Sequence, residues 1–376
     1  MGTQHNHLYS LGTLQLIAVV TIVIGHLWVK DSTFMNSVGV SFCFLYSGFF
    51  TAKGHRFDKS YGLRDHARFI WNKLAKFYPM HLLALAICIT AFVFMRGQTL
   101  IALKTVFFHL TLLSPWSSNP DIYFGYNAVA WWICVLFFLY LISPLIINTL
   151  RAMKLRWQVV LIVGLLLLEF IAGYRPDEQT PSLLLNYYHM YEFPPIRILD
   201  FATGAVLYHI TQSAGWARLA SKLTPGISTL IELGGIALFG LLYWVERTYL
   251  NGVCFRAFCI EAPSVTVLLM TFVLTSHQMG QVSKLLCIQP LKIMQRYTFE
   301  IYLLQVGMFF LMKPLCEKFG ITQHETLHFL VQNALLLLAA WATHRYYVTP
   351  LARLLSISSP SEIKRQEPVA PKNIEY

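Results

Sequence analysis

Charged residues are scarce in this sequence of 376 residues. Only 12% of the residues are Asp, Glu, Lys or Arg, whereas 56% are hydrophobic. A typical soluble domain has about twice that share of charge. The low charge excludes a disordered protein and a coiled coil, and the apolar excess excludes a conventional soluble enzyme. The composition therefore indicates a protein that dissolves in lipid.

The sequence also lacks the short motifs by which many enzymes hold metals or nucleotides. Its seven cysteines are dispersed and show no spacing typical of a zinc site, so no metal is expected. It contains neither a P-loop nor a dinucleotide-binding fingerprint, and no bound cofactor is expected. No internal repeat is detectable, whereas many transporters are built from repeats.

Long apolar segments are abundant and predict about ten transmembrane helices. They lie at 11–29, 38–52, 77–95, 128–149, 157–173, 195–213, 227–245, 262–279, 296–313 and 329–348. The segment 99–114 is interrupted by Lys104 and His109, so we expect an interfacial or re-entrant helix there. The predicted fold is an all-α polytopic membrane bundle. Residues 1–350 would form the embedded domain, and residues 351–376 a polar, disordered cytoplasmic tail.

The net charge of +11 is distributed unevenly along the chain. If both termini are cytoplasmic, the cytoplasmic segments hold 20 of the 29 lysines and arginines. This excess on one side favours that orientation, because cytoplasmic loops are enriched in basic residues. The excess of basic residues is thus interpreted as a signal of membrane topology, and no nucleic acid partner is expected.

Ionisable side chains inside apolar segments are costly and often face a cavity or a partner. Six such residues occur here: His26, Glu169, Asp200, Glu232, Glu300 and His344. His26 is of most interest, because a neutral imidazole can remove the proton from a hydroxyl group. Gln15 precedes it by eleven residues, which places both on one helix face about 16 Å apart. The alternative is that His26 is structural and Gln15 lies at the membrane interface.

Two further features suggest binding surfaces. The basic block 53–76 ends in Lys73 and Lys76, and clustered cations at a helix end can bind the phosphates of a donor such as coenzyme A. The alternative is contact with anionic lipids. The predicted outer loops 115–127 and 174–195 combine aromatic residues with Asn, Asp and Glu, which suits sugar rings. An aromatic belt at the membrane interface would have the same composition.

Six segments, in this order, resemble the acyltransferase 3 family of integral-membrane acyltransferases. They are VTIVIGH ending at His26, SFCFLYSGFF around Ser47, the basic stretch with Lys73, Lys76 and Pro79, AWWICVLFFLYLISPL with Trp131, RILDFATGAVL with Arg197 and Asp200, and YTFEIYLLQ with Glu300 and Gln305. The resemblance extends from about residue 10 to residue 350. Four positions depart from the family pattern: Gln15, Lys73 and Lys76 replace arginines, and Gln305 replaces a histidine. These departures suggest a divergent branch.

The resemblance implies transfer of an acyl group, most often acetyl, from cytoplasmic acyl-coenzyme A to a sugar hydroxyl of a cell-surface glycan or its lipid-linked precursor. It implies His26 as base or transient acyl carrier. Gln15, Lys73 and Lys76 would bind the donor. Ser47, Trp131, Arg197, Asp200, Glu300 and Gln305 would line or support the cavity. The expected location is the inner membrane of a bacterium.

Two other classes of protein fit the same composition. Ten spans with scattered carboxylates are also typical of a transporter or flippase for a polar lipid or small solute. A structural membrane protein is the third interpretation, and it predicts that Gln15, His26 and the basic block tolerate substitution. The oligomeric state is left open by the sequence.

Overall fold

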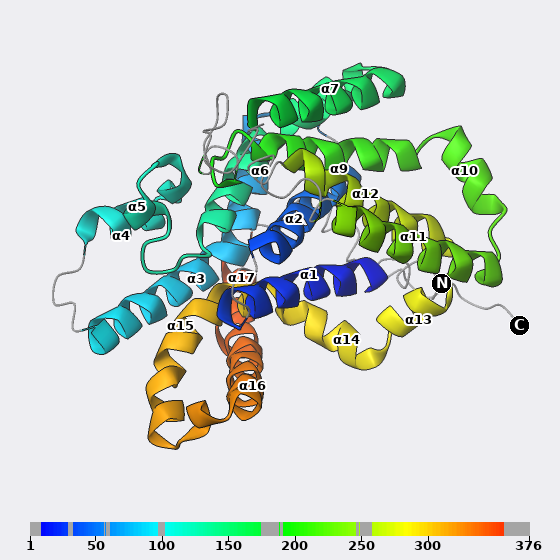
Figure 1. The fold of residues 1–376 in the computed structure, drawn as a ribbon. Helices are drawn as coiled ribbons and strands as arrows, with labels where there is room; N and C mark the ends of the chain where they lie inside the picture. Colours follow the sequence, from blue (N-terminus) through cyan, green and yellow to red (C-terminus); the bar gives the residue numbers. More distant parts are fainter. Residues whose placement is uncertain are drawn as a thin grey trace, which may run out of the picture.

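The part of the chain described by the structure, a computed structural model, is mostly helical. The described residues are 9–28, 33–55, 57, 61–96, 102–173, 188, 191–245, 248 and 258–356, and no strand occurs among them. Figure 1 shows a bundle in which α1 (Tyr9–Leu27) and α2 (Thr33–Gly54) lie among the other helices. The prediction of an all-α bundle is confirmed.

Each of the ten predicted spans coincides with a helix. Besides α1 and α2 these are α3 (Leu63–Arg96), α6 (Trp131–Ala152), α7 (Leu155–Gly173), α9 (Arg197–Thr211), α11 (Pro225–Val245), α12 (Phe258–Leu274), α15 (Thr298–Lys318) and α16 (Glu325–Thr343). Among the described residues, seven helical stretches are long and apolar enough to cross a membrane; they contain α1, α3, α6, α7, α11, α15 and α16. The shorter α9 and α12 have 15 and 17 residues. The protein is therefore a helical membrane protein, while ten spans and cytoplasmic termini remain predictions.

The segment 99–114 does not form a span. Its helix α4 (Leu103–Leu110) has only 8 residues and is followed by η2 (Ser114–Trp116) and α5 (Pro120–Tyr123). Nε2 of His81 donates to the His109 carbonyl at 2.9 Å, and Nε2 of His109 donates to the Ile122 carbonyl at 3.1 Å. Burial, together with the nearby His81, lowers the pKa of His109 to about 4. These two histidines fasten α4 and α5 to α3.

Two glycines let α2 and α9 cross in direct backbone contact. A β-carbon at Gly48 would collide with the backbone of Phe201, and one at Gly204 would collide with the backbone of Leu45. Small residues at a helix crossing allow such close approach within a membrane. The α2–α9 pair therefore forms a dense centre against which α1, α6 and α12 pack.

The outer helices present apolar side chains outward. In α7 and α11, leucines such as Leu167, Leu168 and Leu230 are exposed although they belong to candidate membrane spans. Such surfaces are stable only against lipid or another apolar partner. The arrangement agrees with a bundle embedded in a bilayer.

One intramembrane carboxylate joins α11 to the short helices that follow α12. Glu232 is fully buried and accepts hydrogen bonds from the backbone N–H groups of Gly280, Val282 and Ser283, and from the Ser283 hydroxyl. It thereby caps α13 (Gln281–Leu286) at its N-terminus, where a negative charge is favourable.

Short helices connect the long ones in this part of the chain. They are α10 (Ala214–Ser221), which precedes α11, and η4 (Thr275–His277), α14 (Gln289–Met294) and η5 (Gln295–Tyr297), which lie between α12 and α15.

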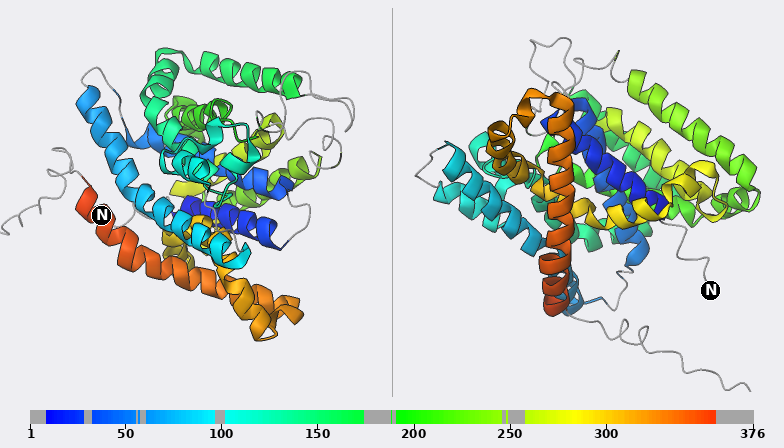
Figure 2. Two further views of the ribbon diagram at one scale, coloured as in Figure 1. Left: turned by 90° about the vertical axis from the view of Figure 1, so that its left-hand side faces the viewer. Right: turned by 90° about the horizontal axis from the view of Figure 1, so that it is seen from below.

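The C-terminal part of the bundle is a long rod at its periphery. After η6 (Ile321–Gln323), α16 continues through a π-helical turn, η7 (His344–Val348), into α17 (Thr349–Leu355). Figure 2 shows this rod as one continuous element. The indole Nε1 of Trp71 donates to the Leu355 carbonyl at 2.6 Å and ties α17 to α3. Helix thus continues beyond the predicted boundary at residue 350, and residues 357–376 of the predicted tail lie outside the described residues.

Candidate functional site

Among the described residues, two sizeable cavities lie between the helices. The larger has a volume of about 660 Å³ and includes Lys73, Lys76, Arg296 and Arg353 in its lining. We call it the cation-lined cavity. The smaller, of about 470 Å³, is lined mainly by aromatic and aliphatic side chains and includes His26. We call it the aromatic cavity. Seven of the predicted site residues line one of these cavities: Gln15, Ser47, Lys73, Lys76 and Glu300 the cation-lined cavity, and His26 and Trp131 the aromatic one.

Helix α1 passes along both cavities. Gln15, Val19 and Ile22 line the cation-lined cavity, and His26 lines the aromatic one. Steps of four, three and four residues keep these side chains on one stripe of the helix. The eleven residues from Gln15 to His26 correspond to about 16 Å along the axis. The predicted common face of Gln15 and His26 therefore borders the cation-lined cavity at one end and the aromatic cavity at the other.

Three other helices continue from one cavity to the other. α2 contributes Val40 to the aromatic cavity and Ser47 to the cation-lined one, and α6 contributes Trp131 and Trp132 to them respectively. Tyr302 of α15 lines both cavities, and its ring centroid lies 5.3 Å from that of Trp132. The Tyr302 ring, packed against Trp132, thus forms part of the partition between the cavities.

The four cations come from three segments. Lys73 and Lys76 are on α3, Arg296 is in η5 and Arg353 is on α17. The Lys73 ammonium lies 4.5 Å from the ring centroid of Tyr140, a cation–π contact that orients the lysine within the cavity. Arg296 and Arg353 are not among the predicted site residues, because the sequence indicates them only as cytoplasmic charges. Four converging cations are suited to a ligand that carries several phosphates.

A histidine–carboxylate pair also belongs to the cation-lined cavity. Nδ1 of His344 lies 2.7 Å from Oε1 of Glu300. The Glu300 side chain is 3% exposed and that of His344 is 31% exposed. His344 is the first residue of η7, and π-helical turns often occur at functional sites. Glu300 is a predicted site residue, whereas His344 had been noted only as an intramembrane ionisable group.

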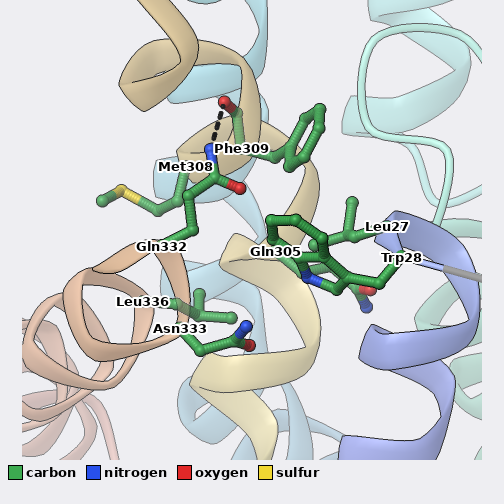
Figure 3. A pocket seen from close by; sticks show the side chains of 8 residues that line it. All are labelled: Leu27, Trp28, Gln305, Met308, Phe309, Gln332, Asn333 and Leu336. Carbon is green, nitrogen blue, oxygen red and sulfur yellow. Dashed lines mark hydrogen bonds between the residues drawn. The ribbon is translucent and has the colours of Figure 1, made fainter. Parts of the chain in front are cut away.

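His26 is exposed to the aromatic cavity at the end of α1. Its Nδ1 lies 3.2 Å from Oε1 of Gln305, which is fully buried on α15. The indole of the nearby Trp28 packs edge-on against Phe309, His328 and Phe329. In Figure 3, Gln305 lies beside Leu27 and Trp28 at a small void of about 10 Å³. The end of α1 that carries His26 is thus fastened to α15 and α16.

Arg197 and Asp200 support the aromatic cavity from behind. Nη1 of Arg197 and Oδ2 of Asp200 form a buried ion pair at 2.8 Å, and Nε donates to the Tyr191 carbonyl at 2.8 Å. The guanidinium carbon lies 4.8 Å from the Tyr191 ring centroid and 5.9 Å from that of Trp131. Both rings line the aromatic cavity. The ion pair therefore holds the cavity wall and is not itself part of the lining.

The predicted aromatic outer loops contribute in part. Phe124 from the first loop and Tyr191 from the second line the aromatic cavity. Much of the second loop, residues 174–187 and 189–190, lies outside the described residues.

The apolar outer surface, the long apolar helices and the two interior cavities define an integral membrane protein with an internal site. Comparison with known proteins assigns its family. Residues 8–345 match the sequence model of the acyltransferase 3 family, described as an acyltransferase domain, and the chain belongs to this family.

A curated relative is the acyltransferase MdmB of Streptomyces mycarofaciens. It is 28% identical over 196 residues, a stretch that covers 49% of this chain and 49% of the relative. The chain thus matches about half the length of that relative. No solved structure matches the chain.

Proposed function

We propose that the protein is a membrane O-acyltransferase that moves an acyl group, acetyl in the first instance, from acyl-coenzyme A to a hydroxyl group of a cell-surface glycan or its lipid-linked precursor. The observation that carries the proposal is the end-to-end arrangement of a cation-lined cavity and a cavity that contains His26. Family membership supports acyl transfer as the reaction class.

The cation-lined cavity suits the donor. Lys73, Lys76, Arg296 and Arg353 would bind the phosphates of coenzyme A, and Gln15 and Ser47 add neutral polar groups to the same cavity. Lysines act on phosphate as point charges, whereas arginines can form two parallel hydrogen bonds. The slender, weakly polar arm of the donor would extend past Val19, Ile22 and Tyr302 toward His26. The positive lining supports a cytoplasmic entrance.

The direction of the helices supports this orientation. α1 and α15 run from the cation-lined cavity to the aromatic cavity, and α2 and α6 run the opposite way. In the predicted ten-span order these are the first, ninth, second and fourth spans. Odd-numbered and even-numbered spans then have opposite directions, as alternation across a bilayer requires. We propose the inner membrane of a bacterium as the location.

The reaction would take place at His26. The neutral imidazole removes the proton from the acceptor hydroxyl, and the resulting oxygen attacks the thioester carbonyl. The carbon–sulfur bond breaks, coenzyme A leaves as a thiolate, and the imidazolium returns its proton to that thiolate. A base can remove this proton only if the acceptor hydroxyl lies beside it. The aromatic cavity next to His26 leaves room for the acceptor.

The aromatic cavity suits a sugar that binds through its apolar face. Trp131 and Tyr191 offer rings, and Asn36 supplies a polar side chain in the same cavity. The Arg197–Asp200 pair would keep these rings in place.

The test is deletion of the gene followed by an assay of surface glycan for base-labile acetyl groups. We expect their loss, restoration by the wild-type gene, and no restoration by His26→Ala. His324→Ala, at an exposed histidine before α16, is the control and should restore acetylation. Acetylation that persists in the deletion strain refutes the glycan acceptor. Transport of a labelled solute by purified protein in liposomes, without dependence on acyl-coenzyme A, would favour the transporter interpretation.

A further inference from the structure

The hydrogen bonds of Gln305 indicate which ring nitrogen of His26 carries hydrogen. We infer that Gln305 is a positioning residue that fixes the neutral imidazole of His26 in the tautomer with hydrogen on Nδ1, which leaves the lone pair of Nε2 as the base in the aromatic cavity. The inference rests on the proposed function for its catalytic meaning, but the tautomer itself is a property of the structure.

The orientation of the Gln305 amide is set by its second partner. One end of the amide lies 2.8 Å from the carbonyl oxygen of Tyr302, one turn earlier in α15. A carbonyl oxygen can only accept a hydrogen bond, so the group that faces it must be the amide NH₂. The amide oxygen therefore faces the other way, toward His26.

The proton on His26 follows from this orientation. Nδ1 lies 3.2 Å from the Gln305 amide oxygen, which can only accept. Nδ1 must then carry a hydrogen, since two lone pairs would otherwise face each other. In a neutral imidazole only one nitrogen carries hydrogen, so Nε2 is left as an acceptor.

An amide at this position differs from a carboxylate in one important respect. A carboxylate would fix the same tautomer but would also stabilise the imidazolium. Gln305 orients the ring without adding a negative charge, so it favours the imidazolium less than a carboxylate would. Among the described residues, the other titratable side chains that line the aromatic cavity are Tyr191 and Tyr302, and no charged side chain does so.

The arrangement is also held firmly. Gln305 is fully buried, and the Trp28 indole packs against rings from α15 and α16 two residues after His26. Packing around Gln305 and Trp28 therefore limits rotation of the His26 ring, so that Nδ1 stays turned toward the Gln305 amide oxygen.

The kinetic test compares three variants in purified protein with acetyl-coenzyme A and a glycan acceptor. Gln305→Leu removes the acceptor of the Nδ1 hydrogen, and we expect kcat to fall by about 100-fold while KM for the donor changes little. Gln305→Glu keeps an acceptor and adds charge, so it should retain most of kcat at high pH. The acidic limb of its pH–rate profile should move upward by about one pH unit. Gln332→Leu is the matched control, because Gln332 is buried and donates to the Phe309 carbonyl on the same helix, α15 (Figure 3).

A spectroscopic test decides the tautomer without any activity. With ¹⁵N-labelled histidine, the His26 resonances are identified by their loss in His26→Ala. In the wild type we expect a protonated Nδ1 and an unprotonated Nε2, and in Gln305→Leu a shift toward exchange between the two tautomers. Hydrogen on Nε2 in the wild type overturns the inference, as does unchanged kcat in a folded Gln305→Leu protein. If the wild type has the expected tautomer but transfers no acyl group, the proposed function fails while the tautomer assignment stands.

Discussion

Nδ1 of His344 and Oε1 of Glu300 are joined at 2.7 Å, although 44 residues separate them in the sequence. The contact links the start of α15 to the π-helical turn η7, from which α17 continues. Arg353 of α17 and both members of the pair line the cation-lined cavity. The pair therefore fixes the position of the wall that carries one of the four cations.

Removing the carboxylate of Glu300 should weaken donor binding. In Glu300→Leu, His344 loses its hydrogen bond to α15, and η7 is held less firmly beside the cavity. We expect KM for acetyl-coenzyme A to rise about tenfold, the equivalent of about 1.4 kcal/mol. Glu300→Gln retains an acceptor and should have a smaller effect. Steady-state kinetics measure both, and Glu325→Gln, at an exposed carboxylate of α16, serves as the control. An unchanged KM in Glu300→Leu would show that the pair does not support the donor site.

Reversing a charge in the cation-lined cavity should raise KM for the donor more than it lowers kcat. Lys76→Glu places a negative charge where phosphates are proposed to bind, and we expect KM to rise at least tenfold. The KM of the wild type should also rise with salt, since screening weakens exposed charge interactions. Lys222→Glu, at an exposed lysine beyond α10, is the matched control. Equal effects of the two reversals would argue against a phosphate site in this cavity.

The helical positions of the site could be predicted from the sequence because they depend on local periodicity. The stripe Gln15–Val19–Ile22–His26 follows from 3.6 residues per turn once the first apolar segment is recognised. The set of cations could not be predicted in the same way. Arg296 and Arg353 lie far from Lys73 in the sequence, and only tertiary packing brings them to one cavity.

The intramembrane carboxylates show a second limit of prediction from sequence. Glu232 and Glu300 look alike as acidic residues in apolar helices. In the structure Glu232 caps α13 through three backbone N–H groups, whereas Glu300 pairs with His344 in a cavity. Their surroundings come from helices that are distant in sequence, so neither role is encoded by the neighbouring residues.

The α2–α9 crossing should not tolerate a single added methyl group. Gly48→Ala and Gly204→Ala each place a β-carbon against backbone, and we expect losses of about 1–3 kcal/mol in stability. Thermal unfolding of the detergent-solubilised protein measures this effect as a lower midpoint. Gly240→Ala is the control, since a β-carbon there meets open space, and it should be neutral or slightly stabilising. If Gly48→Ala and Gly204→Ala both unfold at the same midpoint temperature as the wild type, α2 and α9 can move apart with little loss of stability.

Opening the partition at Tyr302 should cause the acyl donor to be hydrolysed without transfer of its acyl group to the acceptor. Tyr302 lines both cavities and packs against Trp132, so Tyr302→Ala would open a passage between them. Water would then reach the thioester more easily, because exclusion of water is what protects a reactive group in a closed site. We expect more free coenzyme A to be released without acceptor, by about a factor of ten, and less acyl group to be transferred when acceptor is present. Tyr302→Phe keeps the ring and should preserve the wild-type ratio of transfer to hydrolysis. Thiol release and acylated product are measured in the same reactions. If Tyr302→Ala leaves the ratio unchanged, the ring does not control the passage, and the donor must reach His26 by another route.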